Sequence, residues 1–191
     1  MRLVVTGGAG FIGANFVRTV AHRYPEARVT VVDAMTYAAN RASLTDLLAP
    51  SGDRAHVELV EADCADAALV DRLVSELTGL PIANASLLDE ASAAAEAIGL
   101  MSRAKKKGRR VVLDARLHPQ VLSVAAERAR AIDLEVAVED LSAELVGEDY
   151  CGVVIAYPGT EGDITDPRPV IDAIHERGGL ATVVTDPLAL M

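Results

Sequence analysis

The chain has 191 residues, of which 51% are hydrophobic and 3% aromatic, and its formal net charge is −10. This length suits one generous domain or two small ones, with a largely aliphatic core. The acidic balance argues against nucleic acid or an anionic membrane as the main partner. No apolar run reaches the roughly 18 residues of a membrane span, and no signal-peptide pattern precedes the first predicted strand. Together with two separated cysteines, Cys64 and Cys151, these features predict a cytoplasmic protein.

The chain opens with the pattern of a strand, a glycine-rich turn, a helix and a second strand. Residues 2–6 are mostly apolar and predict the first strand, and residues 11–23 have helical spacing. Residues 28–33 predict the second strand, which ends in Asp33. This order is a βαβ unit, and in that context a glycine-rich turn indicates a dinucleotide site.

The glycines between the first strand and the first helix have the spacing of a phosphate-binding turn. Gly8, Gly10 and Gly13 fit G-x-G-x-x-G, and Gly7, Gly10 and Gly13 fit G-x-x-G-x-x-G. One glycine permits the tight turn, one lets the backbone touch a pyrophosphate, and one lets helix and strand pack closely. Asp33, 20 residues after Gly13, is placed to accept the ribose hydroxyls of NAD and to repel the 2′-phosphate of NADP. An ordinary βα turn without a ligand is the alternative.

A second βα pair follows the first βαβ unit. Residues 56–63 predict a third strand that also ends in an acid, and residues 66–77 have helical spacing with Asp66 as the N-cap. Two features lie between the second and third strands. A helical stretch ends near Ala49, and a turn follows at residues 50–54.

Three segments of this first part resemble one enzyme family. They are TGGAGFIG at residues 6–13, DAMTYAAN at residues 33–40 and EADCAD at residues 61–66. Together they are similar to the nucleotide-sugar 4,6-dehydratases, which are extended short-chain dehydrogenase/reductases of the NAD-dependent epimerase/dehydratase family, with dTDP-glucose 4,6-dehydratase as the nearest type. The resemblance covers about residues 1–74.

The resemblance implies a pocket for the adenosine-diphosphate end of NAD. In that family the glycines hold the pyrophosphate, and the acid at the position of Asp33 holds the adenosine ribose. Residues at the positions of Thr36, Asp63 and Cys64 line the ribose and adenine end. The cofactor-binding residues that follow are Gly7, Gly8, Gly10, Phe11, Ile12, Gly13, Asp33, Thr36, Asp63 and Cys64.

The same resemblance stops near Ser75, before the residues that carry out chemistry. The family continues with a Ser/Thr position and Tyr-x-x-x-Lys, whose lysine lowers the tyrosine pKa so that the phenol serves as a base. The lysines of this chain are residues 105–107. Tyrosines 24, 37, 150 and 157 are followed four residues on by Arg28, Arg41, Val154 and Glu161. We therefore predict no catalytic residue in the chain and lean toward a protein that is not an enzyme.

The rest of the chain resembles a different family. The segments are LTGLPIANASLLDEASAAAEA at residues 77–97, HPQ at 118–120, GVVIAYPGT at 152–160, DPRPVIDAIHER at 166–177 and VVTDPLAL at 183–190. They are similar to the N-terminal half of the glycine cleavage system P-protein, the decarboxylating glycine dehydrogenase, which has a fold-type-I pyridoxal-phosphate architecture.

This second resemblance implies no working pyridoxal-phosphate site. In the family the Schiff-base lysine lies in the other half, and no lysine of this chain has a suitable place. His118 and Asp186 stand where related enzymes stack on the cofactor ring or pair with its nitrogen. A helix-capping histidine and a strand-end aspartate are the structural alternative.

The predicted fold is α/β, with about seven mostly parallel strands and helices on both faces. Residues 1–76 form an N-terminal Rossmann βαβαβ half, and residues 77–191 form a P-protein-like segment of the fold-type-I large-domain kind. The two parts either share one long sheet or form two abutting blocks. Within the second part, Ser86-Leu-Leu-Asp89 resembles a capping box that opens a helix toward Lys107. Further strands are predicted at residues 109–114, 134–138, 152–156 and 180–185.

Other candidate sites are weak. The basic run at residues 103–110 suits a solvated helix end better than an anion contact. The four histidines have no ligand spacing, so we expect no metal site.

Three functions are compatible with these patterns. The first is a catalytically incomplete NAD-binding module in a hybrid chain, either designed or fused. The second is a non-catalytic P-protein fragment that acts as an assembly piece and associates with itself. The third is an NAD-dependent sugar-nucleotide dehydratase or epimerase that takes its catalytic groups from a partner chain.

Overall fold

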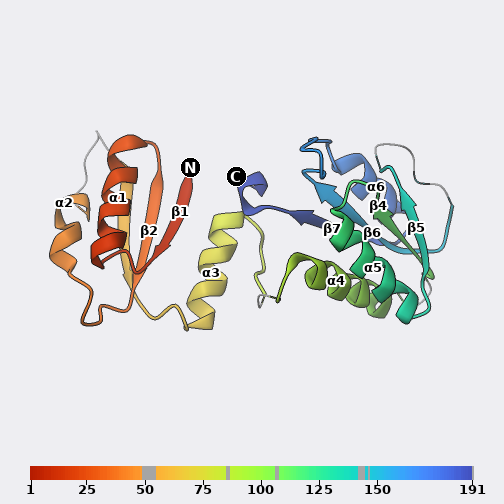
Figure 1. Ribbon diagram of the computed structural model, residues 1–191, viewed down its shortest axis with the longest axis horizontal. Helices are drawn as coiled ribbons and strands as arrows, with labels where there is room; N and C mark the ends of the chain where they lie inside the picture. The colour runs from red at the N-terminus through yellow and green to blue at the C-terminus, as the bar shows by residue number, and fades with distance from the viewer. Residues whose placement is uncertain (49–54, 85–86, 106–107, 142–144, 146, 191) are drawn as a thin grey trace. The chain divides into compact units, whose positions relative to one another are not determined.

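The computed structural model describes residues 1–48, 55–84, 87–105, 108–141, 145 and 147–190. They form two compact units, unit 1 over residues 1–84 and unit 2 over residues 85–190 (Figure 1). Each unit has its own parallel sheet, so the residues described here form two sheets and not one long sheet. The junction predicted after residue 76 lies within helix α3 (Ala67–Thr78), whereas the units divide after Asn84.

Unit 1 is a three-stranded parallel sheet with helices packed on it. Its elements are β1 (Arg2–Thr6), α1 (Phe11–Arg23), β2 (Arg28–Asp33), the 3₁₀ helix η1 (Arg41–Leu44), α2 (Thr45–Leu48), β3 (His56–Glu61) and α3. The strand order is β1-β2-β3, with Val5 opposite Val31 and Val31 opposite Leu59. Because parallel strands carry their carboxyl ends at the same edge, the segments that follow β1, β2 and β3 meet there.

Helix α1 and the central strand β2 share the core of unit 1. Val17 of α1 is buried in one cluster with Val29 and Val31 of β2, and Leu44 and Leu47 close this cluster from the η1–α2 segment. β-branched valines suit a strand because their restricted side chains pack well on a pleated surface. Each such burial contributes about 1.5–3 kcal/mol relative to an exposed side chain.

Helix α3 begins and ends where local sequence signals place it. The Asp66 carboxylate accepts a hydrogen bond from the N–H of Leu69 at 3.2 Å, as the predicted N-cap should. The helix ends before Gly79, whose φ of 73° is left-handed. Leu73 is the buried residue of α3, and the Arg2 guanidinium donates to the carbonyl of Glu76 at 2.7 Å, which ties the helix to β1.

Unit 2 is a four-stranded parallel sheet with helices on both faces. Its elements are α4 (Glu90–Ala104), β4 (Arg110–Asp114), α5 (Pro119–Ala131), β5 (Glu135–Glu139), β6 (Tyr150–Tyr157), α6 (Arg168–Glu176), β7 (Leu180–Thr185) and the 3₁₀ helix η2 (Pro187–Leu190). The strand order is β5-β4-β6-β7. The predicted α/β class with parallel sheets and helices is therefore confirmed for the chain.

The start of helix α4 differs from the prediction. Asp89 is its N-cap, and the Asp89 carboxylate accepts a hydrogen bond from the N–H of Ser92 at 2.7 Å. Ser86, which we expected to cap the helix, lies outside the described residues. The helix ends at Ala104, before the predicted end at Lys107, and Lys107 also lies outside the described residues.

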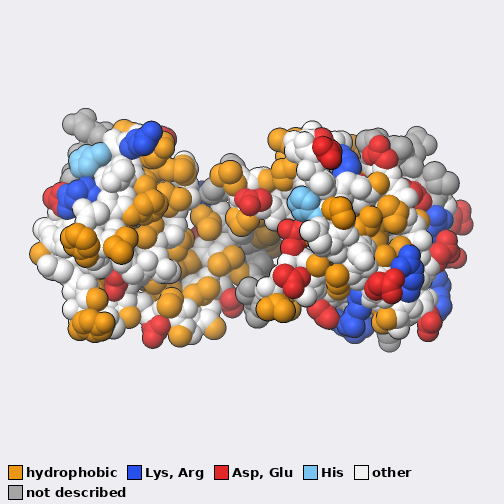
Figure 2. All heavy atoms as spheres, in the orientation of Figure 1, with side chains coloured by type: hydrophobic (Ala, Val, Ile, Leu, Met, Phe, Trp, Pro, Cys, Tyr) orange, Lys and Arg blue, Asp and Glu red, His pale blue; other side chains and the backbone are white. Residues whose placement is uncertain are grey.

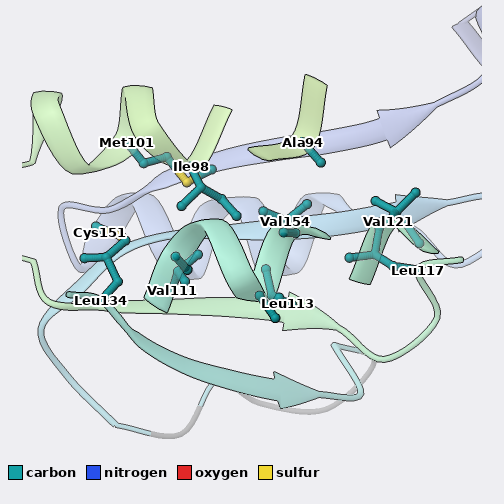
Figure 3. Packing of buried hydrophobic residues seen from close by; sticks show 14 residues of the cluster. Ala94, Ile98, Met101, Val111, Leu113, Leu117, Val121, Leu134, Cys151 and Val154 are labelled. Atoms are coloured by element: carbon teal, nitrogen blue, oxygen red, sulfur yellow. The ribbon is translucent and has the colours of Figure 1, made fainter. Parts of the chain in front are cut away.

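The core of unit 2 has two layers, one on each face of the sheet. On one face, Ala94, Ile98 and Met101 of α4 point toward Val154 of β6, as Figure 3 shows. The alanines of α5 complete this layer because their small side chains let the two helices approach each other. On the other face, Ile174 of α6 packs against the buried residues Val112, Val153 and Ile155. Strand β6 is almost entirely buried, which fits its uncharged sequence.

Charge is distributed unevenly over the surfaces of the two units. On the face drawn in Figure 2, unit 2 carries most of the acidic and basic side chains, whereas unit 1 presents mainly hydrophobic and uncharged groups. The exposed hydrophobic residues of unit 1 include Phe11, Ile12 and Tyr37. All three lie at the carboxyl edge of its sheet, in the segments that follow β1 and β2.

Candidate functional site

The glycine-rich turn joins the carboxyl end of β1 to the first turn of α1. Gly7 has a φ of 67°, a left-handed conformation that glycine adopts without the Cβ penalty. Its N–H donates to the carbonyl of Val32 at 2.9 Å, and its carbonyl accepts from the N–H of Gly10 at 3.1 Å. The turn is therefore fixed to β2 on one side and closed on itself on the other.

At Gly8 and Gly13 the neighbouring atoms leave no room for a Cβ, whereas Gly10 has slightly more space. A Cβ on Gly13 would lie 2.2 Å from the carbonyl oxygen of Gly7, and one on Gly8 would lie 2.6 Å from Cγ1 of Val31. Neither position can hold a side chain without backbone or core movement. A Cβ on Gly10 would lie 3.3 Å from the same Gly7 oxygen, a tight contact that a shift of a few tenths of an ångström relieves.

The first turn of helix α1 carries unpaired backbone donors. Gly10 is the N-cap and has no side chain to cap the helix. The first paired N–H belongs to Ala14, which donates to the carbonyl of Gly10 at 2.9 Å. The N–H groups of Phe11, Ile12 and Gly13 come before it and have no partner within the helix. Phe11 and Ile12 are 84% and 81% exposed, so solvent reaches this end, where the helix dipole favours an anion such as phosphate.

The carboxylate of Asp33 lies against this turn. Asp33 is only 8% exposed. Its Oδ2 accepts a hydrogen bond from the N–H of Ala9 at 2.9 Å, and its Oδ1 accepts one from the N–H of Met35, also at 2.9 Å. The acid that spacing alone predicts is therefore at the turn, and both of its oxygens already have a backbone donor.

The remaining predicted residues lie in the segments after β2 and β3. Thr36 is exposed, and its carbonyl accepts from the N–H of Ala39 at 3.0 Å. Asp63 and Cys64 are exposed in the turn after β3, where Asp63 Oδ1 accepts from the N–H of Ala65 at 2.9 Å. The structure brings the ten predicted residues to one edge of the sheet of unit 1, and their binding role stays a prediction.

Sequence reasoning missed two pairs of residues that shape this edge. The carbonyl of Ala9 accepts from the N–H of Asn40 at 2.9 Å, which holds the segment after β2 against the glycine turn. The motif leaves Ala9 and Asn40 unspecified because both act through backbone atoms. Arg41 also forms an ion pair with Glu61 at the end of β3, which no sequence pattern indicates.

A cavity of about 260 Å³ lies at the other end of the same sheet. It is bordered by the first residues of the three strands, Arg2, Arg28 and His56, and by Leu73 and Glu76 of α3. The charged side chains around it are exposed. It lies away from the glycine turn and contains none of the predicted site residues.

Unit 2 has a smaller cavity, of about 170 Å³, at the carboxyl ends of its strands. His118 and Asp186 both line it, together with Glu90, Arg116 and Tyr157. His118 is the N-cap residue of α5, but its side chain makes no capping hydrogen bond, contrary to the structural alternative. Asp186 accepts from the N–H of Leu188 at 2.7 Å, as a strand-end aspartate does. No lysine is among the lining residues, so they do not fit a Schiff-base-bound pyridoxal phosphate.

A buried ion pair stands beside this cavity. Asp114 is 0% exposed, and its carboxylate accepts from the Arg116 guanidinium at 2.8 and 3.0 Å. Arg116 also donates to Asp163 at 3.1 Å and to Thr165 at 2.6 Å. The hydrogen bond with Asp114 raises the pKa of Arg116 above its ordinary value. With its donors engaged, this guanidinium supports the local fold and is not free to bind an anion.

The described part of the chain offers neither a metal centre nor a membrane span. Within it, no group of three or more His, Cys, Asp or Glu side chains is arranged to hold a metal ion. None of the helices described there is long and apolar enough to cross a membrane.

The fold and the turn define the class of each unit, a Rossmann-type βαβαβ half in unit 1 and a parallel α/β layer structure in unit 2. The chain belongs to two families. Residues 3–98 match the NAD dependent epimerase/dehydratase family, and residues 68–191 match the glycine cleavage system P-protein family. The chain is therefore a hybrid of the two families. Their matches overlap from residue 68 to residue 98, so α3 and the first part of α4 are matched by both.

Curated relatives of the second part are glycine dehydrogenases (decarboxylating). The protein from Gluconobacter oxydans (strain 621H) is 46% identical over 120 residues, which is 62% of this chain and 13% of that protein. The one from Cereibacter sphaeroides (strain KD131 / KCTC 12085) is 51% identical over 119 residues, 62% of this chain and 12% of that protein. The chain therefore spans only about an eighth of the length of these relatives.

Two solved structures are similar to the chain to different degrees. A crystal structure of glycine decarboxylase (P-protein) of the glycine cleavage system, in inhibitor-bound form, aligns with a TM-score of 0.58 and 32% identity, over 63% of this chain and 28% of that one. A dTDP-glucose 4,6-dehydratase from Bacillus anthracis in complex with NAD aligns over 93% of this chain and 62% of its own, with 17% identity and a TM-score of 0.35. Only the first superposition is close enough to support the fold.

Proposed function

We propose that unit 1 binds NAD by its adenosine-diphosphate end and that the chain performs no chemistry of its own. The observation that carries this proposal is the unpaired first turn of α1, which follows a turn where Gly8 and Gly13 leave no room for a side chain. Three N–H groups, from Phe11, Ile12 and Gly13, are available there to the pyrophosphate. The family of residues 3–98 is described as NAD dependent, which supports the same ligand.

The ribose and adenine part of the proposed site is formed by the segments around the turn. Asp33 favours NAD over NADP, because a carboxylate repels a 2′-phosphate. The exposed segment that holds Thr36 and the turn of Asp63 and Cys64 flank this edge of the sheet and supply the ribose and adenine contacts. The family resemblance, and not a measured contact, assigns these three residues.

Hydride transfer is not part of the proposal. In a Rossmann fold the nicotinamide side is built by the second βαβ half, and the sheet of unit 1 has no described strand beyond β1. The chain also lacks Tyr-x-x-x-Lys. A dehydratase or epimerase activity would need catalytic groups from another chain, and turnover of a nucleotide sugar with a transient reduced-nicotinamide signal would reveal it.

Calorimetric titration of the wild type and two variants with NAD and NADP tests the proposal. Gly10→Ala should fold, since its Cβ comes no closer than 3.3 Å to any neighbouring atom. It should still weaken NAD binding about tenfold or more, because a methyl group stands where the pyrophosphate approaches. Glu176→Ala, an exposed change in unit 2, is the matched control and should bind like the wild type. Equal affinity of the wild type and Gly10→Ala would remove the phosphate turn from the site.

A second candidate function is assembly through unit 2, and strand β7 favours it. All six residues of β7, Leu180–Thr185, are half-buried, and none is charged. In the part of the chain that is described, β7 pairs only with β6. An uncharged edge strand is a template for pairing with another chain. We infer that two copies associate through β7.

Sedimentation velocity over a range of protein concentrations tests this candidate. Thr182→Lys places a charge on the edge strand and should shift the population toward monomer. Gln120→Lys adds the same charge at an exposed position of helix α5 and should not. A wild-type protein that stays monomeric at the highest concentration would exclude assembly through β7.

A further inference from the structure

The backbone N–H and carbonyl of Ala9 lie at the centre of the contacts around the glycine turn. Its N–H donates to Asp33 Oδ2 at 2.9 Å, and its carbonyl accepts from the N–H of Asn40, also at 2.9 Å. Ala9 is 1% exposed, so water cannot replace either partner. The N–H and the carbonyl of Ala9 are thus held by the last residue of β2 and by the segment that follows it.

The Asp33 carboxylate links two segments of the chain. One oxygen holds Ala9 and the other holds the N–H of Met35, whose φ of 52° is left-handed. Left-handed backbone is unfavourable for a methionine and persists only where neighbouring contacts hold it. Asp33 therefore fixes the conformation of both the glycine turn and the segment that contains Thr36.

We propose that Asp33 is a positioning residue for the pyrophosphate: its carboxylate fixes the glycine turn through Ala9, in addition to the ribose contact that the family resemblance assigns to it. This inference rests on the proposed NAD site. Ala9 immediately precedes Gly10, the N-cap of the helix whose N–H groups face the ligand. A shift of the Ala9 peptide would therefore move the start of that donor array, and donors act on phosphate only where geometry is preserved.

For a ligand without a ribose, positioning by Asp33 and repulsion by its charge predict changes in affinity of opposite sign. A carboxylate close to a bound pyrophosphate repels it, so by charge alone removing Asp33 should tighten the binding of inorganic pyrophosphate. If the carboxylate positions the turn, removing it should weaken that binding despite the lost repulsion. The sign of the change thus separates positioning from simple electrostatics and from a contact confined to the ribose.

The test uses the full chain and inorganic pyrophosphate, with calorimetric titration of the wild type, Asp33→Ala and Asp33→Asn. We expect Asp33→Ala to bind pyrophosphate about tenfold more weakly. The pyrophosphate affinity of Asp33→Asn should lie between those of the wild type and Asp33→Ala. Its one amide oxygen can accept from the N–H of Ala9 but not from that of Met35 as well. Asp71→Ala removes an exposed acid from α3 and is the charge-matched control.

A ligand-free measurement accompanies the titrations. Amide hydrogen exchange at Ala9, followed by NMR, should be slow in the wild type and at least about tenfold faster in Asp33→Ala, while the amides of Val31 and Leu59 in the sheet stay protected. Unchanged exchange at Ala9, or pyrophosphate binding that tightens in the Asp33 variants, overturns the inference while leaving NAD binding intact. A wild type that binds neither NAD nor pyrophosphate overturns the proposed function, and the pyrophosphate role of Asp33 with it.

Discussion

Gly13 lies so close to Gly7 that a Cβ on Gly13 would stand 2.2 Å from the Gly7 carbonyl oxygen. The two glycines belong to helix α1 and to the turn after β1. Their contact sets how closely the helix approaches the strand, which in turn directs the first N–H groups of the helix toward the ligand side of the turn. The third glycine of the motif is therefore a packing requirement in this chain.

Replacing Gly13 by alanine should destabilise unit 1. Alanine is favoured over glycine in a helix by roughly 0.5–1 kcal/mol, so propensity alone predicts a more stable protein. We expect the opposite sign, because the methyl group must displace the backbone of Gly7 and Gly8. Urea unfolding followed by far-UV circular dichroism measures the change, and Gly10→Ala is the matched variant. A Gly13→Ala protein as stable as the wild type would contradict the packing.

The buried pair of Asp114 and Arg116 should matter far more than an exposed pair of the same kind. Arg116→Ala leaves the fully buried Asp114 carboxylate without its cation, which we expect to cost about 3 kcal/mol. Arg168 and Asp166 have the same spacing, but both are exposed, so Arg168→Ala should change the free energy of unfolding much less. Similar losses in the two variants, measured by urea unfolding, would show that burial is not the cause.

The same exposed pair has a consequence for titration. Hydrogen bonds from the Arg168 side chain and backbone N–H lower the pKa of Asp166 from 3.8 to about 2. Because the pKa is depressed in the folded chain, the stabilisation from this pair is present above pH 3.8 and is lost as the pH falls through about 2. Carboxyl-carbon NMR should show Asp166 titrating near 2 in the wild type and closer to 3.8 in Arg168→Ala. Identical titrations would refute the pairing.

The two cysteines should react at very different rates. Cys64 is exposed after β3, whereas Cys151 is buried in β6 and burial raises the pKa of its thiol. We expect an aromatic disulfide reagent to modify Cys64 quickly and Cys151 only when the protein unfolds. Cys64→Ser should therefore remove the fast phase of the reaction. If NAD occupies the proposed adenine end, saturating NAD should slow the fast phase, and Glu176→Ala should leave that effect unchanged.

Local patterns in the sequence predicted most of the secondary structure and the place of the site. The glycine spacing, the strand before it and the acid at the end of β2 lie within one short stretch of sequence, so Gly7 to Gly13 and Asp33 could be identified without knowledge of the fold. Asp66 as a helix cap could be predicted for the same reason. Ser86 and Asp89 are both residue types that cap helices well. Which of them is the N-cap depends on where the helix begins, and local sequence does not determine that position.

Features that depend on distant or backbone contacts could not be predicted. Nothing in the sequence of β1 or β7 says that these strands end their sheets, because pairing partners are a property of the whole fold. The contacts of Ala9 with Asp33 and Asn40 involve a main-chain peptide that any residue would supply. The ion pair between Arg116 and Asp163 joins residues far apart in sequence, and no motif marks it.

Calorimetric titration of the purified wild-type chain with NAD, and separately with ADP, tests the central claim most directly. We predict saturable binding of both ligands with similar affinities, because every proposed contact is made by unit 1 to the adenosine-diphosphate end. The absence of binding heat for both, with circular dichroism showing a folded protein, would contradict a nucleotide site in unit 1. NAD binding far tighter than ADP would contradict the restriction of the site to that end of the cofactor.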